Sequence, residues 1–376
     1  MLCFIARALT AWKSIAVAAP LAPAAVLVAA LFLAGVARGQ VPTLEPQERV
    51  ATFGNGIDVK GNRIWICNGF VAQLLRRRAG THCDPSCWQV EQTISRPESE
   101  PVFGPAITWR HNTLVVSGGD PFGAFGGAYV YERQNGEFVV RQHLHENLPL
   151  FGRTHAVAGD YMVINSHNVF SPLPVGPYLY HRTPSGLWES LGLLASSAQL
   201  ADNFDQYGIN VAMTRRNILV GADEGGYVAA FRNRGGVWEE RQVLRPSGNA
   251  GGFGRGIAIR GKIAVIGAYV PGVVYVFELR DGAWQQLQML ERWDGSQVPF
   301  FGQEVAFDGK RIAAVDQQSI YVYKLRQGMW VPEAKLVNSG GFSEVEPFDR
   351  LQFEGHFLYA AGTGIWRYDL SALEGG

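Results

Sequence analysis

Apolar and polar positions alternate along this chain in short runs that recur at a nearly constant interval. Each copy opens on an aromatic–glycine pair, degenerate in the last copy, continues as an alternating run, turns at two residues and returns as an apolar run ending in small residues. The copy at Phe253-Gly254 then predicts a third strand over 273–277, a tight turn at Asp281-Gly282 and a fourth strand over 284–290. Each copy therefore predicts one four-stranded antiparallel sheet.

Seven such copies follow one another. The openings, 46 to 56 residues apart, are Phe53-Gly54, Phe103-Gly104, Phe151-Gly152, Tyr207-Gly208, Phe253-Gly254, Phe301-Gly302 and Phe348-Asp349. A second aromatic repeats in phase at the start of the expected fourth strand, as Trp88, Phe138, Trp188, Trp238, Trp284 and Trp330. A radial repeat of this size predicts an all-β, seven-bladed β-propeller of four-stranded antiparallel blades, with the aromatic rows packed between blades.

The last copy is one strand short, because the chain supplies three strands after Phe348 and no fourth. At the other end, residues 41–50 precede Phe53 without a blade of their own, at the spacing where fourth strands precede the other openings. We predict that this N-terminal segment completes the last blade and closes the ring.

Residues 1–39 differ from the rest of the chain. Arg7 and Lys13 precede an uncharged apolar stretch over 14–36, and Ala37-Arg38-Gly39 fits a small-residue cleavage site. This pattern predicts a secretory signal peptide, with an uncleaved membrane anchor over 14–36 as the alternative. The expected propeller domain is 40–376, secreted or periplasmic, with no other membrane contact.

Charge argues against nucleic acid as a partner. Residues 40–376 hold 30 Lys and Arg against 33 Asp and Glu, a formal net charge of −3, since residues 1–39 remove three basic residues from the 33 of each kind in the chain. The one basic cluster, Arg76 to Arg78, is interpreted as an exposed strand end. We expect a monomer.

Two of the four cysteines lie close together in a long hairpin of the first copy. Cys83 and Cys87 flank Asp84-Pro85-Ser86, and in an exported protein this spacing predicts a disulfide. The alternative is half of a metal site with His82. Cys67 lies in an apolar run and is interpreted as a buried thiol.

The motif of the sixth copy resembles the bacterial FG-GAP repeat. Phe301-Gly302, Val305 to Gly309 and Tyr321 to Tyr323 carry the resemblance, which spans about residues 41–370 in all seven copies. The family includes the N-terminal propeller of integrin α chains, so the resemblance implies adhesion or ligand binding. Integrin-type blades often hold calcium in an Asp-x-Asp-x-Asp-Gly loop, but the two-residue turns here are too short for one, and we expect no metal or cofactor.

Loops between second and third strands and between successive blades share one face of a propeller, which we call the loop face. The predicted ligand-binding residues on it are Asp120, His167, Asp223, Tyr269, Asp316 and Trp293. Acids and aromatics that converge there suit a sugar, a cation or a basic peptide. The alternative is that each is an ordinary solvated loop residue.

Catalytic motifs are absent from the sequence: it has no Gly-x-Ser-x-Gly elbow, no His-Glu-x-x-His and no phosphate loop. The first hypothesis is therefore a protein- or glycan-binding module that acts through its loop face, and not an enzyme. The alternative is a propeller-scaffold enzyme, a lyase or hydrolase, that uses acids and His167 at the channel mouth. A structural envelope protein is the third.

Overall fold

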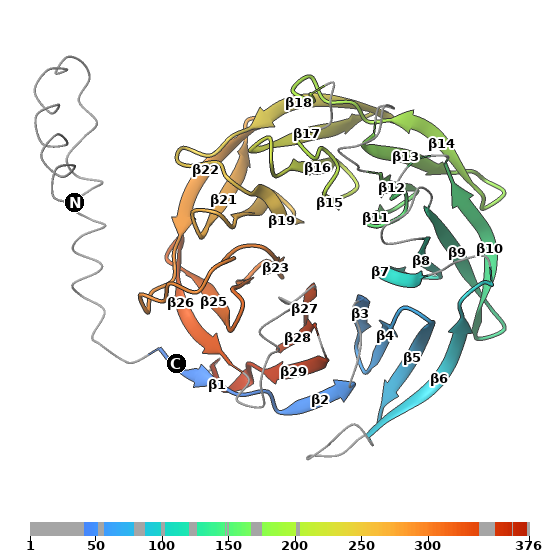
Figure 1. Ribbon diagram of the computed structural model, residues 1–376, viewed down its shortest axis with the longest axis horizontal. Coiled ribbons are helices and arrows are strands. Elements are labelled where there is room, and N and C mark those ends of the chain that lie inside the picture. Colours follow the sequence, from blue (N-terminus) through green and yellow to red (C-terminus); the bar gives the residue numbers. More distant parts are fainter. Residues whose placement is uncertain are drawn as a thin grey trace, which may run out of the picture. The chain divides into compact units, whose positions relative to one another are not determined.

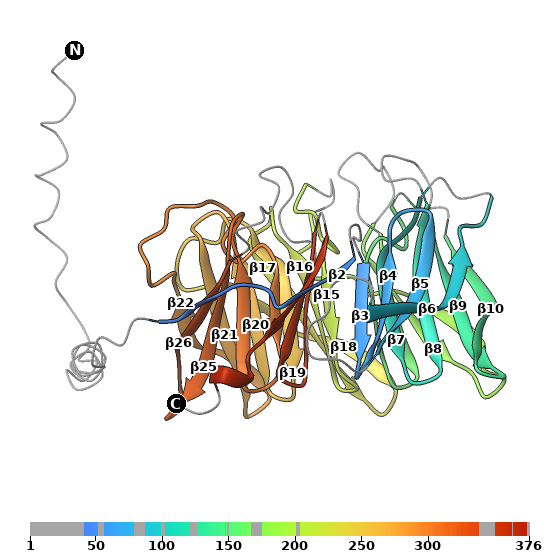
Figure 2. The ribbon, with the colours of Figure 1, turned by 90° about the horizontal axis from the view of Figure 1, so that it is seen from below.

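Seven four-stranded antiparallel sheets stand around a common axis, which confirms the predicted β-propeller (Figure 1). Viewed from the side, the strands run between the two faces of the ring (Figure 2). The computed structural model describes residues 41–51, 56–78, 87–98, 102–119, 126–146, 148, 150–166, 175–200, 204–337, 350–362 and 364–373. Within them, no helix is long and apolar enough to cross a membrane.

The first four blades follow chain order from the inner to the outer strand. Blade one is β3 (Gly56–Lys60), β4 (Arg63–Cys67), β5 (Val71–Arg77) and β6 (Trp88–Ser95). Blade two is β7 (Val102–Arg110), β8 (Thr113–Gly119), β9 (Gly126–Gln134) and β10 (Glu137–His145). Blade three is β11 (His155–Ala158), β12 (Tyr161–Asn165), β13 (Pro177–Arg182) and β14 (Trp188–Leu193). Blade four is β15 (Val211–Met213), β16 (Asn217–Ala222), β17 (Tyr227–Arg234) and β18 (Val237–Leu244).

The last three blades include the strands that close the ring. Blade five is β19 (Phe253–Arg260), β20 (Ile263–Ala268), β21 (Val273–Arg280) and β22 (Ala283–Leu290). Blade six is β23 (Val305–Phe307), β24 (Arg311–Val315), β25 (Ile320–Arg326) and β26 (Met329–Leu336), with β1 (Thr43–Leu44) added at its outer edge. Blade seven is β27 (Arg350–Glu354), β28 (Phe357–Ala361), β29 (Ile365–Asp369) and β2 (Glu48–Ala51), before a 3₁₀ turn at Ser371–Leu373.

The N-terminal segment closes the ring as predicted, and it also reaches one blade further. β2 pairs antiparallel with β29 and is the fourth strand of blade seven. β1 pairs in parallel with β26, so that the blue strands of Figure 1 lie beside the orange and red ones. Between them stands Pro46, which cannot donate a ladder hydrogen bond and so allows the chain to pass from one sheet to the next.

The aromatic–glycine openings lock each blade against its neighbour. Phe103, Phe151, Tyr207, Phe253 and Phe301 are all at most 1% exposed. The glycine that follows each has φ between 88° and 101°. The small residues that end the second strands leave space for this backbone, since a Cβ on Gly267 would lie 1.7 Å from the Gly302 carbonyl oxygen. The repeated residues therefore serve the packing of each blade against the next.

Candidate active site

The inner strands of all seven blades share one register, which allows their residues to be compared. Each first hairpin closes at an equivalent residue, and these are Lys60, Arg110, Ala158, Thr214, Arg260, Asp308 and Glu354. Two residues earlier lies what we call the cap position, occupied by Asp58, Thr108, Ala156, Ala212, Ala258, Ala306 and Gln352. Three residues before the hairpin-closing residue lies the packing position, which is occupied by Ile57, Ile107, His155, Val211, Ile257, Val305 and Leu351.

Both positions depart from the repeat in adjacent blades. Four blades have alanine at the cap position, whereas blades seven, one and two have polar side chains there. The packing position is aliphatic in six blades and is a histidine in blade three. Because all seven positions face the same kind of inter-blade environment, packing alone does not require these polar residues. We call Asp58, Thr108, Arg110 and His155 the channel cluster.

The cap position satisfies the backbone of the next blade's inner strand. Gln352 accepts a hydrogen bond from the Val59 N–H and donates one to the Val59 carbonyl, both at 3.0 Å. Asp58 Oδ2 accepts from the Trp109 N–H at 2.8 Å. A neutral amide is therefore sufficient for this contact, and Asp58 brings a charge that the joint between blades does not need.

The Asp58 carboxylate is buried, and only one of its oxygens is engaged. Arg110 Nη1 lies 2.9 Å from Oδ2, and the Arg110 side chain is 48% exposed. Oδ1 has no hydrogen-bond partner among the residues that the structure describes. Burial raises the pKa of Asp58, although Arg110, the Trp109 amide, Lys60 and the Gln352 side chain act in the opposite direction. The result is a buried carboxylate that is more basic than usual.

His155 is the second buried polar group with an available atom. Thr108 Oγ1 lies 3.0 Å from His155 Nδ1, whereas Nε2 has no partner in the described part of the chain. Burial lowers the pKa of His155 to about 3, and the positive charges of Arg350 and Arg110 contribute to this shift. The imidazole is therefore neutral at physiological pH and can present Nε2 to a bound molecule without carrying charge.

The channel cluster can support acid–base chemistry on a neutral substrate. A carboxylate with a raised pKa is suited to take a proton from water, and neighbouring guanidinium and imidazole groups can stabilise a developing oxyanion. No group of three or more His, Cys, Asp and Glu side chains that could hold a metal occurs among the described residues. We therefore assign no metal site there.

Two of the predicted loop-face residues come together around an arginine. Asp223 follows β16 and Tyr269 follows β20; Arg255 Nη1 from β19 lies 3.6 Å from Asp223 Oδ2. Burial raises the pKa of Tyr269, and the negative charges of Asp223 and Glu224 add to the shift. Burial likewise raises the pKa of Asp223, opposed by Arg255. Tyr269 is partly exposed, so this group borders solvent.

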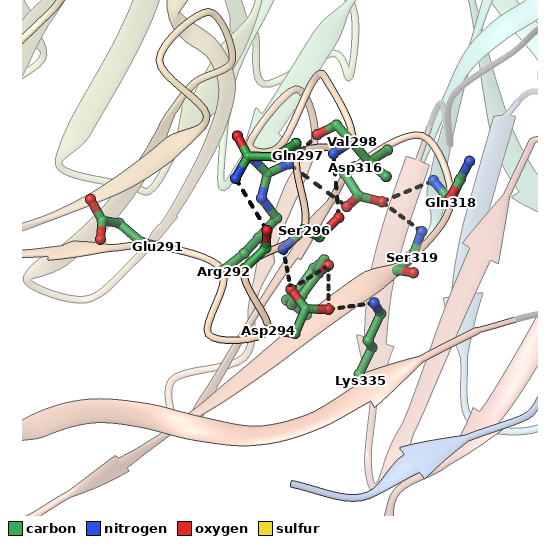
Figure 3. Close-up of polar contacts among 12 residues, drawn as sticks. Glu291, Arg292, Asp294, Ser296, Gln297, Val298, Asp316, Gln318, Ser319 and Lys335 are labelled. Carbon is green, nitrogen blue, oxygen red and sulfur yellow. Dashed lines mark hydrogen bonds and ion pairs between the residues drawn. The ribbon is translucent and has the colours of Figure 1, made fainter. Parts of the chain in front are cut away.

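Another predicted residue, Asp316, is engaged within blade six (Figure 3). Asp316 is fully buried, and its Oδ1 accepts hydrogen bonds from the Gln318 and Ser319 amides at 2.9 and 2.7 Å. Arg292 Nη1 lies 3.8 Å from its Oδ2. Asp316 thus stabilises the turn between β24 and β25, which is a structural role and not the predicted ligand-binding role.

Trp293 is packed in the same loop region. Its ring makes edge-to-face contacts with Tyr321 and Tyr323 at centroid distances of 5.0 and 5.2 Å. Beside it, Asp294 binds Lys335 and accepts from the Tyr321 hydroxyl, as Figure 3 shows for the Asp294–Lys335 contact. The contacts of Trp293 indicate a packing role, although its ring remains partly exposed.

Three predicted residues lie outside the described residues: Asp120, His167 and Cys83. The Cys83–Cys87 disulfide stays a prediction for this reason. Cys67 is a buried free thiol, as expected. The channel cluster was not predicted from the sequence because its residues lie on inner strands, whereas binding residues were expected on loops. An alignment of the seven inner strands at their hairpin turns would have revealed His155, the one polar residue at the packing position.

Comparison with known proteins gives structural neighbours only, since no family model and no curated protein matches this chain. A candidate 6-phosphogluconolactonase from Bacteroides fragilis matches with a TM-score of 0.51 and 12% identity, over 75% of this chain and 86% of its own. A candidate 6-phosphogluconolactonase from Bacteroides uniformis gives 0.56 and 13%, over 77% and 84%. The periplasmic gluconolactonase of Pseudomonas aeruginosa gives 0.50 and 13%, over 78% and 85%. At these identities the match establishes the shared fold.

These neighbours correct the resemblance stated from sequence. The FG-GAP, integrin-like assignment is wrong: no family model matches, and these neighbouring propellers are named as lactonases. Phe-Gly openings and in-phase aromatics serve the packing between blades. Propellers of unrelated families need the same packing, so these motifs do not identify a family. The same neighbours count against a binding module and against the expectation of no enzyme activity, and they favour the alternative of an enzyme on a propeller scaffold.

Proposed function

We propose that this protein is a hydrolase that opens the ring of a lactone, a cyclic ester, with the channel cluster as its active site. The observation that carries the proposal is a pair of buried polar atoms, Asp58 Oδ1 and His155 Nε2, that have no partner among the described residues and lie near the charge of Arg110. The lactonases named above have the same fold, and their activity supports this choice of reaction.

The proposed reaction uses the two orphan atoms in complementary roles. Asp58 Oδ1 takes a proton from a water molecule, whose oxygen forms a bond to the lactone carbonyl carbon. We assign the tautomer in which Thr108, 3.0 Å from His155 Nδ1, is the donor, so that the imidazole carries its proton on Nε2 and donates it to the oxyanion, while Arg110 adds positive charge. The ring C–O bond then breaks, and Asp58 returns the proton to the departing oxygen. Water and lactone become one hydroxy acid.

The substitution Asp58→Asn tests this proposal. An asparagine side-chain oxygen at this position can still accept from the Trp109 N–H, as the amide of Gln352 does at the equivalent position, so the fold should persist. We expect kcat/KM for a lactone to fall roughly 10²–10⁴-fold, the usual contribution of a general base. Lactone opening is followed by proton release in a weakly buffered solution, after subtraction of the uncatalysed rate.

The matched control is Asp316→Asn, which neutralises another buried aspartate with one orphan oxygen. An amide can hold that turn, because Asn68 Oδ1 accepts the Phe70 and Val71 amides in blade one. We expect D316N to retain lactone turnover. Equal activity of D58N and the unmodified protein would contradict the assignment of Asp58, and absence of turnover across five-, six- and seven-membered lactones would contradict the proposed function.

A further inference from the structure

We infer that Asp223, Arg255 and Tyr269, together with Phe300, form a subsite for a polyhydroxylated part of the substrate at the loop face of the channel. The inference deepens the proposed function, on which its place in the reaction rests. It names the substrate class, a lactone derived from a sugar, and it assigns recognition to residues separate from the channel cluster.

The aromatic half of the subsite is built by a departure from the repeat in blade five. The residue before the aromatic–glycine opening is Leu150, Gln206 and Phe300 in blades three, four and six, each with positive φ. In blade five this residue is Gly252, and a Cβ there would lie 2.3 Å from the Tyr269 ring. The Tyr269 ring can therefore occupy this position only because residue 252 has no side chain.

Tyr269 and Phe300 form a pair of rings that border solvent. Their centroids are 5.8 Å apart with an interplanar angle of 37°, and both residues are partly exposed. The next residue, Val270, is 61% exposed. Aromatic faces of this kind bind the C–H face of a sugar ring, while the phenol hydroxyl remains able to exchange hydrogen bonds.

The polar half of the subsite is the loose pair of Arg255 and Asp223. Their closest nitrogen–oxygen distance, 3.6 Å, is longer than a hydrogen bond. The Arg255 side chain is 34% exposed. Asp223 is 2% exposed and its Oδ1 accepts the Glu224 N–H, so Arg255 is the group of this pair that reaches solvent. Its guanidinium can donate to two neighbouring hydroxyl groups, and the Asp223 charge behind it holds the guanidinium in place.

The location of the subsite suits a substrate that enters from the loop face. Arg255 lies on inner strand β19, two residues before Ile257 at the packing position, the register occupied by His155 in blade three. The subsite is thus on the loop-face side of the channel cluster. Trp293, the other aromatic predicted at the loop face, by contrast packs on two tyrosines.

The test compares two six-membered lactones that differ in their hydroxyl groups, glucono-δ-lactone and δ-valerolactone. We expect Tyr269→Ala and Arg255→Gln to raise KM for glucono-δ-lactone about tenfold or more, with kcat/KM for δ-valerolactone within about twofold of the unmodified protein. Tyr269→Phe keeps the ring and should lie between. Phe70→Ala, which removes a 65% exposed aromatic of blade one, is the control.

Failure of the subsite and failure of the proposed function give different results. Equal changes for the two lactones, or none, would overturn the subsite and leave the lactonase in place. If neither lactone is turned over, calorimetric titration with glucitol decides on the subsite alone. Binding by the unmodified protein that Tyr269→Ala weakens at least about fivefold supports it, and no binding, or equal binding, overturns it.

Discussion

The outer strands and the inner strands of this propeller use polar residues in opposite ways. At the outer rim, Gln92, Gln142, Gln242 and Gln288 occupy the same register of four blades. Each donates to the carbonyl, and accepts from the N–H, of the aromatic residue that opens the next blade's fourth strand, at 2.7–3.0 Å. On the inner strands, by contrast, Asp58 and His155 occur once each at their positions and keep a buried atom without a partner among the described residues.

The difference separates residues that hold the blades together from residues that are candidates for chemistry. A polar side chain that recurs with the repeat and has all its hydrogen bonds is a joint between blades. A polar side chain that appears in one blade, where six others are aliphatic, and that keeps a buried atom without a hydrogen bond costs stability. His155 meets this second description: its Nδ1 bonds Thr108 of blade two, but its Nε2 has no partner among the described residues. The rim glutamines meet the first description.

The largest effect on the rim should come from removal of the closing strands. A chain that begins at Phe53 lacks β1 and β2, and with them Glu48, whose buried carboxylate binds Arg77, Arg367 and the Trp88 indole. Loss of one partner from a buried ion pair costs about 3–5 kcal/mol, and the exposed edge of β29 adds to it. We expect the sharp thermal transition of a chain that begins at Gln40 to disappear, as calorimetry would show.

Equal melting temperatures for the two chains would contradict this closure. A third chain that begins at Gln47 separates the two strands, because it lacks β1 and retains Glu48. We expect it to melt close to the longer chain, since β1 contributes one pair of parallel backbone bonds, Lys335 N–H to Pro42 O and Val337 N–H to Leu44 O.

On the channel side, His155→Val should abolish turnover and change stability by at most about 1 kcal/mol at pH 7. Valine already occupies the packing position in blades four and six, as Val211 and Val305. Removal of the unsatisfied Nε2 favours the variant, but loss of the Nδ1 bond leaves the buried Thr108 hydroxyl without this partner; urea unfolding measures the balance. A loss of stability above about 3 kcal/mol, or lactone turnover equal to that of the unmodified protein, would place His155 among the structural joints.

The same variant tests the pKa of His155 through stability. The folded-state pKa is about 3 and the unfolded value about 6.5, so the unfolded chain binds more protons between these limits. This histidine therefore lowers stability as pH falls from about 6.5 towards 3. We expect the stability of H155V relative to the unmodified protein to rise as pH falls from 7 to 4.5. A stability difference independent of pH would contradict the lowered pKa of His155.

The repeat explains why the fold could be predicted and most of the site could not. Spacing alone placed seven blades and the closing strand, because burial between blades demands the same residues each time. The parallel pairing of β1 has no such pattern and was not foreseen. For loop residues, spacing does not determine orientation: Asp223 and Tyr269 meet near Arg255, whereas Asp316 shapes a turn. His155 was not predicted as a site residue because the run that it opens, His155–Ala158, has the ordinary alternation of a strand.

The smallest effect is expected at a single rim joint. Gln288→Ala removes two hydrogen bonds to Trp330, each worth about 1 kcal/mol, and should lower stability by about 1–2 kcal/mol. Gln288→Glu should lie between, because a carboxylate accepts from the Trp330 N–H and cannot donate to its carbonyl. Gln285→Ala, an exposed position on the same strand, is the control. Both Gln288 variants should retain lactone turnover, since the joint lies on the outer strand. If Q288A instead lost turnover at full stability, a residue that recurs with the repeat would have a functional role, and the division between rim and channel would no longer hold.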